Sequence, residues 1–489
     1  MNAPIIVVSK EKRLIVRLSR KPYPPKLQNC RFCMFILALI LQKKPRGTVQ
    51  SYINTLDMHQ KYYSNLDDMF RSNAVDLQKL TDQWFSIIET ECTPKRFRGR
   101  RVFVSDGVKK PKEGRRMPGV TRQHNDSDTQ SKPSSFHGIQ AGGISMLVEH
   151  PLNPAETLSM PIELRILDGL DPVSQWPGTS HPFADEPLEM QSFHRLERYV
   201  PKSEDDVYLV ADRASMSQKL FLECKNISER TGRKVHLITN AKCNAVGFKK
   251  PVYSGIGRPP KKGDRVELAK LFSEKISEFT CKRLFIYGKH QTVRYYTITL
   301  LWGLKLLIPI KFVLCCMEDG RKIILATNDL DLPPVDVIRL YSQRFGSIEE
   351  DFKVLKNEFC GMSYRFWTLS MPHLSHFRSK DAPHILEEVT DEHDRKLVLD
   401  AIRASELYMQ SAFIAQGIVK LLAAKQPVGG IIQKFTQKRT YTERKVSETD
   451  VCSFLCAHKD AILRKYGSHP IIRFLTKRRK EDQVLEDVI

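Results

Sequence analysis

Three carboxylates stand out in this sequence of 489 residues, because each lies where a regular element is expected to hold it. Asp106 ends the apolar run RVFVS, and Asp212 ends a second run, VYLVA. Short continuous apolar runs are typical of strands that are buried on both faces. A carboxylate after such a strand lies at the carboxyl edge of the sheet, where open α/β folds bind ligands. For either aspartate alone, a turn-forming role after a strand is the simpler interpretation.

The third carboxylate lies on an expected amphipathic helix over residues 334–359. Its apolar side chains recur at steps of three and four, at Val337, Tyr341, Phe345, Ile348, Phe352, Leu355 and Phe359. Glu349 lies beside this apolar stripe rather than opposite it. Lys356 follows on the same face two turns later. The helix can therefore present a carboxylate and an amine to the same neighbouring surface.

Three carboxylates on two strands and one helix suit hard divalent cations. Mg²⁺ takes oxygen ligands, usually one or two carboxylates together with substrate phosphates. Two such ions, about 3.5–4 Å apart, activate the attacking oxygen and stabilise the leaving one in phosphodiester cleavage. We therefore expect Asp106, Asp212 and Glu349 to hold two Mg²⁺ ions, for which Mn²⁺ can substitute. Arg344 and Lys356 can offset the charge of a nearby phosphate.

The charge of the chain favours a nucleic acid as its partner. Lys and Arg number 78 against 56 Asp and Glu, a formal net charge of +22. Apolar residues make up 41% of the chain, which supports a folded core and excludes a purely disordered protein. The longest apolar run, residues 32–41, is too short for a membrane span, which needs about 20 residues. Eleven irregularly spaced cysteines and the lack of signal-peptide features favour a cytoplasmic location without a membrane partner.

The pattern along the chain predicts an α/β protein with helical regions at both ends. Residues 1–98 are expected to be helical behind a basic arm, and to bind DNA ends. Strands and helices follow in 99–232, a strand-rich segment covers 233–331, and the Glu349 helix falls in 332–379. Residues 380–489 are expected to be helical again.

Four stretches of the sequence resemble one family when taken in order. They are VSDGVKKPKEGRRMPGV around Asp106, YLVADRA around Asp212, IILATNDLDLPPVDVIRLYSQRF followed by IEEDFKVLK around Glu349, and YRFWTLSM from Tyr364. Their order and spacing resemble the DDE transposases of bacterial insertion sequences, and most closely the insertion-sequence-four type. The resemblance runs from about Val102 to Met371, and more weakly into the flanking helical regions.

The resemblance implies an RNase H-like catalytic core that is interrupted by a β-rich insertion between the second Asp and the Glu. The interval of 349 − 212 = 137 positions leaves room for the strand-rich segment. It also implies that Tyr341, Arg344 and Lys356 position the transposon end and its terminal phosphate. In related transposases an aromatic residue of the insertion, here Trp302, stacks on a flipped base. Most Trp residues in strands belong to a core instead.

What the resemblance implies about function is cut-and-paste DNA transposition. Asp106, Asp212 and Glu349 would be the catalytic residues, acting with Mg²⁺. The partners would be double-stranded DNA, as terminal inverted repeats and as target, and a second copy of the chain in a homodimer on DNA. The location would be the bacterial cytoplasm, with the nucleoid.

A basic loop in the insertion is a further candidate for DNA contact. Arg258, Lys261 and Lys262 lie in the sequence GRPPKKG, which can follow a phosphate backbone or enter a minor groove. The alternative is an ordinary solvated turn.

One departure from the family leaves the third metal ligand open. The family places its Glu four residues after the Arg, whereas here the step is 349 − 344 = 5, so Glu350 competes with Glu349. Phe352 and Lys356 lie at the family's spacing from Glu349. Ser347 and Glu350 also have the spacing of a capping box, which would give Glu350 a local role. The helix is expected either to restart at Ser347 or to absorb the extra residue as a π-bulge.

Three other functions stay open from the sequence. The chain could be a DNA-binding relic of a transposase without catalysis. It could be a sequence-tolerant RNase H-like nuclease that cleaves DNA but does not join strands. A basic scaffold protein would need none of the three carboxylates.

Overall fold

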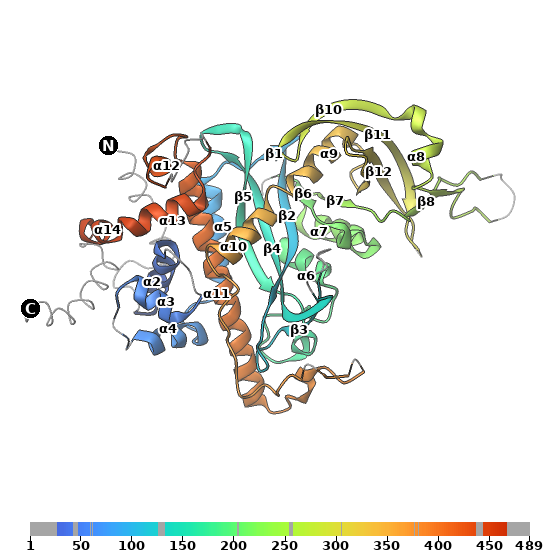
Figure 1. Cartoon of the computed structure of the whole chain (residues 1–489). Helices are drawn as coiled ribbons and strands as arrows, with labels where there is room; N and C mark the ends of the chain where they lie inside the picture. The colour runs from blue at the N-terminus through green and yellow to red at the C-terminus, as the bar shows by residue number, and fades with distance from the viewer. Residues whose placement is uncertain are drawn as a thin grey trace, which may run out of the picture.

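The structure is a computed structural model, and it describes most of the chain. The described residues are 27–42, 47–58, 60, 62–125, 133–202, 205–253, 258–304, 306–375, 377–379, 381–436 and 444–466. The basic arm expected before residue 27 lies outside them. The α/β class expected from the sequence is confirmed, because the chain forms one large mixed sheet with helices on its flanks (Figure 1).

The described part of the chain contains a sheet of 13 strands. Its main path runs in the order β3-β4-β2-β6-β7-β13-β12-β11-β8-β9, while β1 pairs with β2, β10 with β11 and β5 with β4. The strands are β1 Arg96–Phe97, β2 Arg100–Pro111, β3 Val120–His124, β4 Ser135–His150, β5 Asn153–Ile166, β6 Val207–Val210, β7 Val235–Asn240, β8 Val246–Phe248, β9 Arg265–Glu267, β10 Thr280–Ile286, β11 Lys289–Trp302, β12 Ile308–Cys316 and β13 Lys322–Thr327.

Three neighbouring strands in the middle of the sheet are parallel, and their register positions the two aspartates. β2 pairs in parallel with β6, and β6 with β7, while the other pairings are antiparallel. Val104 of β2 lies opposite Val210 of β6. Asp106 and Asp212 each follow their valine by two residues, so they lie side by side just past the parallel pairing of β2 and β6. The expectation that Asp106 ends its strand was wrong, because β2 stays paired with β4 as far as Pro111. The fully buried, apolar β6 is the kind of strand expected there.

The helices flank this sheet. They are α2 Leu27–Leu41, α3 Val49–Thr55, α4 Tyr62–Arg71, α5 Leu77–Glu91, α6 Leu188–Leu196, α7 Gln218–Thr231, α8 Leu271–Glu274, α9 Pro334–Gln343, α10 Ile348–Asn357, α11 Glu392–Ala424, α12 Ile431–Thr436, α13 Glu448–Ala457 and α14 Lys459–Lys465. The N-terminal helices pack with α11 and α13 on one side, and β8 to β12 lie at the other end of the molecule (Figure 1). α7 is the crossover between the parallel strands β6 and β7.

The long helix α11 forms the centre of the helical side. Its 33 residues are long and apolar enough to cross a membrane, but 94% of its most apolar window is buried inside the protein. It closes the edge strand β5 with side-chain hydrogen bonds. Gln410 accepts a bond from the amide of Leu164 (2.9 Å) and donates one to the carbonyl of Ile162 (2.7 Å). Polar groups that satisfy an open sheet edge are typical of a core helix inside a protein rather than of a membrane span.

The helix expected over residues 334–359 restarts at Ser347, which is one of the two alternatives that the sequence left open. α9 ends at Gln343 and α10 begins at Ile348. Ser347 has φ −121° and ψ −93°, which is not helical, so the extra residue is absorbed by a restart and not by a π-bulge. The expected capping box is wrong, because the Ser347 hydroxyl donates to the carbonyl of Arg344 (3.0 Å).

Candidate active site

The two aspartates are held in place by backbone amides. Asp106 Oδ1 accepts a hydrogen bond from the amide of Gly107 (2.9 Å), and Asp212 Oδ1 accepts one from the amide of Ala214 (3.1 Å). The latter bond caps a short 3₁₀ turn that follows β6. Both carboxylates are therefore oriented by the chain that follows them, as they would be in a turn. The turn-forming role and a role in a site are both compatible with these bonds.

α10 reaches the same place because β4 has a glycine opposite Asp106. Gly143 pairs with Asp106 across β2 and β4. A Cβ atom on Gly143 would lie 2.7 Å from the ring of Phe352, a residue of α10. The missing side chain thus lets the helix lie directly on the sheet. As a result Glu349, in the first turn of α10, lines the same cavity as Asp106 and Asp212.

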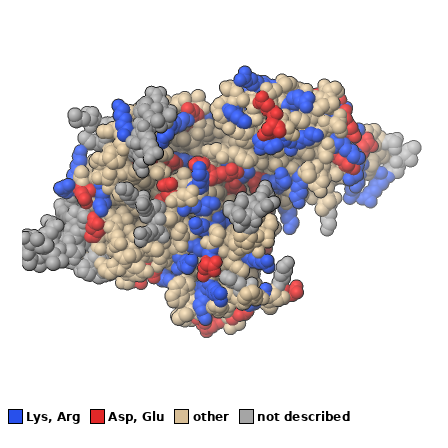
Figure 2. Space-filling view, viewed as in Figure 1, with Lys and Arg blue, Asp and Glu red and all other residues tan. Residues whose placement is uncertain are grey.

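A cavity of about 1060 Å³ contains all three predicted ligands. Asp106, Asp212 and Glu349 line it together with Lys356. Other residues of its wall include Lys109, Gln140, Glu189, Ser192, Phe193 and Phe352. Lys and Arg side chains run down the middle of the molecule's face in Figure 2, with acidic side chains beside them at its centre. The cavity is wide enough for a ligand much larger than a metal ion.

Arg344 joins two of the carboxylates. Its Nη1 lies 2.5 Å from Asp106 Oδ2, and its Nη2 lies 3.1 Å from Glu349 Oε1. The side chain is 9% exposed, so this charge is almost withdrawn from solvent. The sequence predicted that Arg344 serves a phosphate. In the structure it neutralises the carboxylates instead, across the break between α9 and α10.

The four carboxylates of the cavity wall outnumber the cations near them, which are Lys109, Lys356 and Arg344. Burial raises the pKa of Asp106 to about 6; Arg344 opposes this shift, while Asp212 adds to it. Burial also raises the pKa of Glu349, again against the effect of Arg344. Burial and then Asp212 raise the pKa of Glu189. Carboxylates that are hard to ionise together favour binding of a further cation.

Glu189 is a cavity residue that the sequence analysis missed. It lies in the first turn of α6, just after the Pro-rich and Asp-rich stretch that precedes the helix. A single Glu in such a stretch has no motif around it, so no local signal could have identified it. Only the packing of α6 beside β4 brings it to the cavity.

The other residues predicted from the third motif divide between the cavity and its surroundings. Glu350 is not part of the cavity wall; it is exposed and pairs with Lys353 at 3.3 Å. Tyr341 is buried behind the cavity, where it hydrogen-bonds Asn240 and Arg344. Lys356 lines the cavity, and burial, followed by the charge of Lys110, lowers its pKa. The geometry thus brings Glu349 and not Glu350 to the two aspartates.

The predicted DNA contacts of the insertion lie away from this cavity. Arg258, Lys261 and Lys262 are exposed, and the Lys262 amine lies 4.5 Å from the ring centre of Phe248. Trp302 is half-buried at the end of β11, edge-to-face with Phe221 of α7 at 6.0 Å. None of these four residues is part of the cavity wall.

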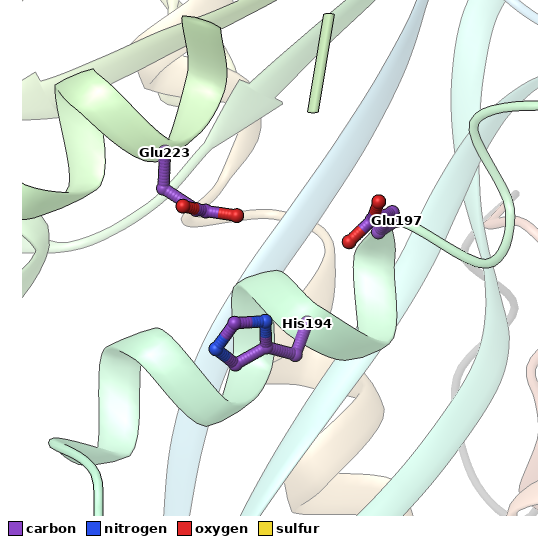
Figure 3. Close-up of side chains that lie close together, drawn as sticks. All are labelled: His194, Glu197 and Glu223. Carbon is purple, nitrogen blue, oxygen red and sulfur yellow. The ribbon is translucent and has the colours of Figure 1, made fainter. Parts of the chain in front are cut away.

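The cavity residues fit Mg²⁺ by chemistry, because carboxylate oxygens are the hard ligands that this ion prefers. Within the described residues, however, only His194, Glu197 and Glu223 form a group of three whose ligand atoms all lie within 4.8 Å of one another (Figure 3). That group lies on α6 and α7, and Arg230 already binds both glutamates, at 2.6 Å and 2.5 Å. In the cavity, Arg344 pairs with both Asp106 and Glu349, just as Arg230 pairs with the two glutamates of the other group.

Comparison of this chain with models of protein families, with curated proteins and with solved structures found no match.

Proposed function

We propose that this chain is a DNA transposase with an RNase H-like core, which cleaves and joins phosphodiester bonds at transposon ends. One observation carries the proposal. Asp106, within β2, and Asp212, just after β6, lie in register on neighbouring parallel strands, and α10 adds Glu349 to the same cavity. The motifs around these three residues are those that resemble the DDE transposases. The large mixed sheet with flanking helices is compatible with such a core.

The three carboxylates would hold two Mg²⁺ ions, which activate the attacking water and stabilise the leaving oxygen when they are bound. Lys356 lines the cavity with an amine that can bind a phosphate oxygen. Arg344 has a guanidinium that can bind two oxygens at once, as it does now with Asp106 and Glu349. It can therefore transfer from the carboxylates to a phosphate as the ions bind.

The reaction needs no covalent intermediate on the protein. In the first step the oxygen of water bonds to phosphorus while the bond to the 3′-oxygen breaks, which leaves a 3′-hydroxyl and a 5′-phosphate. In the second step that hydroxyl bonds to a phosphorus of the target DNA while the bond from this phosphorus to the target 3′-oxygen breaks. The strands are then joined, and a 3′-hydroxyl is left on the target. The substrates are double-stranded terminal repeats and target DNA. Because two ends are processed together, the active form is a homodimer on DNA.

The test is cleavage of a duplex that carries the inverted repeats flanking the gene for this chain, with Mg²⁺ or Mn²⁺. The wild type should nick the repeat ends and join the freed 3′-hydroxyl to a target duplex. Asp106→Asn should do neither. Glu223→Gln, which changes an acid of the α6–α7 group, should behave as the wild type. Cleavage without end preference or joining would instead indicate a nuclease.

A DNA-binding protein without catalysis is the second candidate. It is favoured by the position of Arg344, which occupies the space between Asp106 and Glu349 with its own charge. This function predicts binding to the repeats that needs no metal and is equal in wild type and Asp106→Asn. It also predicts that neither protein cleaves DNA.

A further inference from the structure

A buried ion pair behind α10 has no part in the chemistry described above. Asp351 is completely buried, and Lys420 of α11 bonds its Oδ1. The hydroxyl of Ser145, on β4, donates to Asp351 Oδ2 (3.1 Å). Lys420 also donates to Ser159 of β5 (3.0 Å). One carboxylate of α10 is thus bonded to β4 and α11, and through Lys420 to β5.

The backbone of α10 is joined to α11 at the same residue. Gln416 of α11 donates a hydrogen bond to the carbonyl oxygen of Asp351 (2.9 Å). Burial works against the charge of Lys420, but Asp351 and other acids outweigh it and raise the pKa of Lys420. The ammonium group of Lys420 is therefore favoured at its contact with Asp351 inside the protein.

Stability alone is a weak reason for such a pair. Taking two charges out of water is costly, and apolar residues of similar size often replace a buried pair with no loss of stability. What an ion pair adds is direction, because its hydrogen bonds accept only a narrow range of angles. The contacts of Phe352 and Leu355 on the same helix are apolar, and apolar burial is not directional.

α10 needs a directional contact because it is not continuous with α9. The break at residues 344–347 removes the helix that would otherwise set its rotation. Successive residues of a helix differ by about 100° around its axis, given 3.6 residues per turn. A rotation of that size would exchange Glu349 and Glu350, which are neighbours. Asp351 lies two residues after Glu349, so the contacts that hold its carboxylate oppose this rotation of α10.

We propose that Asp351 and Lys420 are positioning residues, whose buried ion pair fixes the rotation of α10 so that Glu349, and not Glu350, faces Asp106 and Asp212. The inference rests on the proposed function for its effect on DNA cleavage. Its effect on metal binding can be measured without DNA.

The main test uses the double variant Asp351→Asn/Lys420→Met, which removes both charges at nearly constant size and leaves no unpaired buried charge. The dissociation constant of Mn²⁺ is measured by electron paramagnetic resonance, and folding is followed by circular dichroism. We expect a folded protein whose Mn²⁺ affinity is about tenfold lower, as is usual when a partner of a metal ligand is lost. The single variant Lys420→Arg, which keeps a positive charge beside Asp351, should retain the Mn²⁺ affinity of the wild type.

The identity of the ligand gives a sharper readout, which a merely structural role would not change. In the wild type, Glu349→Gln should weaken Mn²⁺ binding and Glu350→Gln should not. In the charge-free double variant this difference should shrink, because either glutamate can then face the cavity. Ser145→Ala removes only one hydrogen bond to Asp351 and should give a smaller loss in the same direction. Glu406→Gln, another buried acid of α11, is the matched control and should leave Mn²⁺ affinity unchanged.

Each outcome decides between this inference and the proposed function. A folded double variant with unchanged Mn²⁺ affinity would overturn the positioning role, and so would a double variant that does not fold. Reduced Mn²⁺ affinity together with a wild type that never cleaves DNA would keep the positioning role and overturn the proposed function. A wild type that binds no Mn²⁺ would overturn both.

Discussion

Two groups of acidic side chains in this protein use the same residue types but differ in how their charge is balanced. Between α6 and α7, Glu197 and Glu223 share Arg230, which is 49% exposed, and His194 pairs with Glu186 at 3.1 Å. In the cavity, Asp106, Asp212, Glu349 and Glu189 share the wall with Lys109 and Lys356, and Arg344 pairs with two of the four acids. The first group is an ion-pair network closed by one arginine, whereas in the second the carboxylates outnumber the nearby cations.

The difference shows that closeness of ligand atoms is a poor guide to a metal site by itself. The atoms of the His194 group lie within 4.8 Å because an arginine already draws two of its members together. In the cavity, burial raises the pKa of Asp106 and of Glu349, so their charges are not fully compensated. A cation between Asp106 and Glu349 must displace Arg344, as one at the His194 group must displace Arg230. In the cavity, however, Asp212 and Glu189 supply further carboxylates that this arginine does not pair with.

The largest expected effect separates the two groups by activity. Asp106→Asn should reduce cleavage at the repeat ends about a thousandfold or more, because the metal contribution to the transition state is worth several kcal/mol. The double variant Glu197→Gln/Glu223→Gln should cleave as the wild type does. Both are measured with a labelled duplex under single-turnover conditions. The opposite pattern would move the catalytic site to α6 and α7.

The next effect distinguishes two neighbouring residues of α10. Glu349→Gln should reduce cleavage at least about a hundredfold, since it removes one charged metal ligand. Glu350→Gln should cause no measurable loss, because Glu350 lies outside the cavity wall and pairs only with Lys353. The same single-turnover assay applies. A loss confined to Glu350→Gln would show that α10 is rotated from its position in this structure.

A third prediction concerns pH and stability in the absence of metal. A carboxyl whose pKa is higher in the folded chain adds stability below its unfolded pKa, and this is lost as pH rises through the folded value. For Asp106 these values are 3.8 and about 6. The free energy of unfolding of the wild type, relative to Asp106→Asn, should therefore fall by about 3 kcal/mol between about pH 4 and pH 7.

Urea denaturation with a chelator present measures this difference at each pH. A difference that stays constant across the range would contradict the excess of negative charge inferred for the cavity. Addition of Mg²⁺ at neutral pH should stabilise the wild type and have less effect on Asp106→Asn.

The smallest expected effect belongs to the Arg230 network. Arg230→Gln should destabilise the protein by about 1 kcal/mol, because the guanidinium is 49% exposed and screened by salt, although its partner Glu223 is buried. Thermal denaturation at low and high salt measures this, and the loss should shrink at high salt. Mn²⁺ affinity should not change. A marked rise of Mn²⁺ affinity in Arg230→Gln would show that the His194 group is a second cation site.

Much of the candidate site could be predicted from local patterns. The apolar runs before Asp106 and Asp212 do form parallel strands, and the two aspartates do lie side by side. Asp106 lies inside β2, however, because antiparallel pairing with β4 extends that strand to Pro111. Glu349 and Lys356 are seven residues apart on one helix, and both line the cavity. Patterns of this kind succeed because they depend on neighbours within a few residues, where strand and helix geometry is nearly fixed.

The remaining parts of the site depend on residues that are far apart in the sequence. Arg344 and Asp106 are 238 positions apart, and Ser145 and Asp351 are 206 apart. Nothing near Glu189 indicates that α6 will carry it to the cavity. The expected capping box at Ser347 failed for a related reason, since the hydroxyl bonds the carbonyl of Arg344 in the turn that restarts the helix.

The sequence by itself determined the residue types, the apolar strand segments and the spacing along the helix, because the physical rules for these act locally. The tertiary structure decided which charges meet. It placed Arg344 between Asp106 and Glu349, and it paired Asp351 with Lys420 inside the protein. The physical reason is that charge pairing and burial depend on the packing of whole elements, such as α10 on Gly143 of β4. The rotation of one broken helix is therefore set by contacts that no stretch of sequence contains.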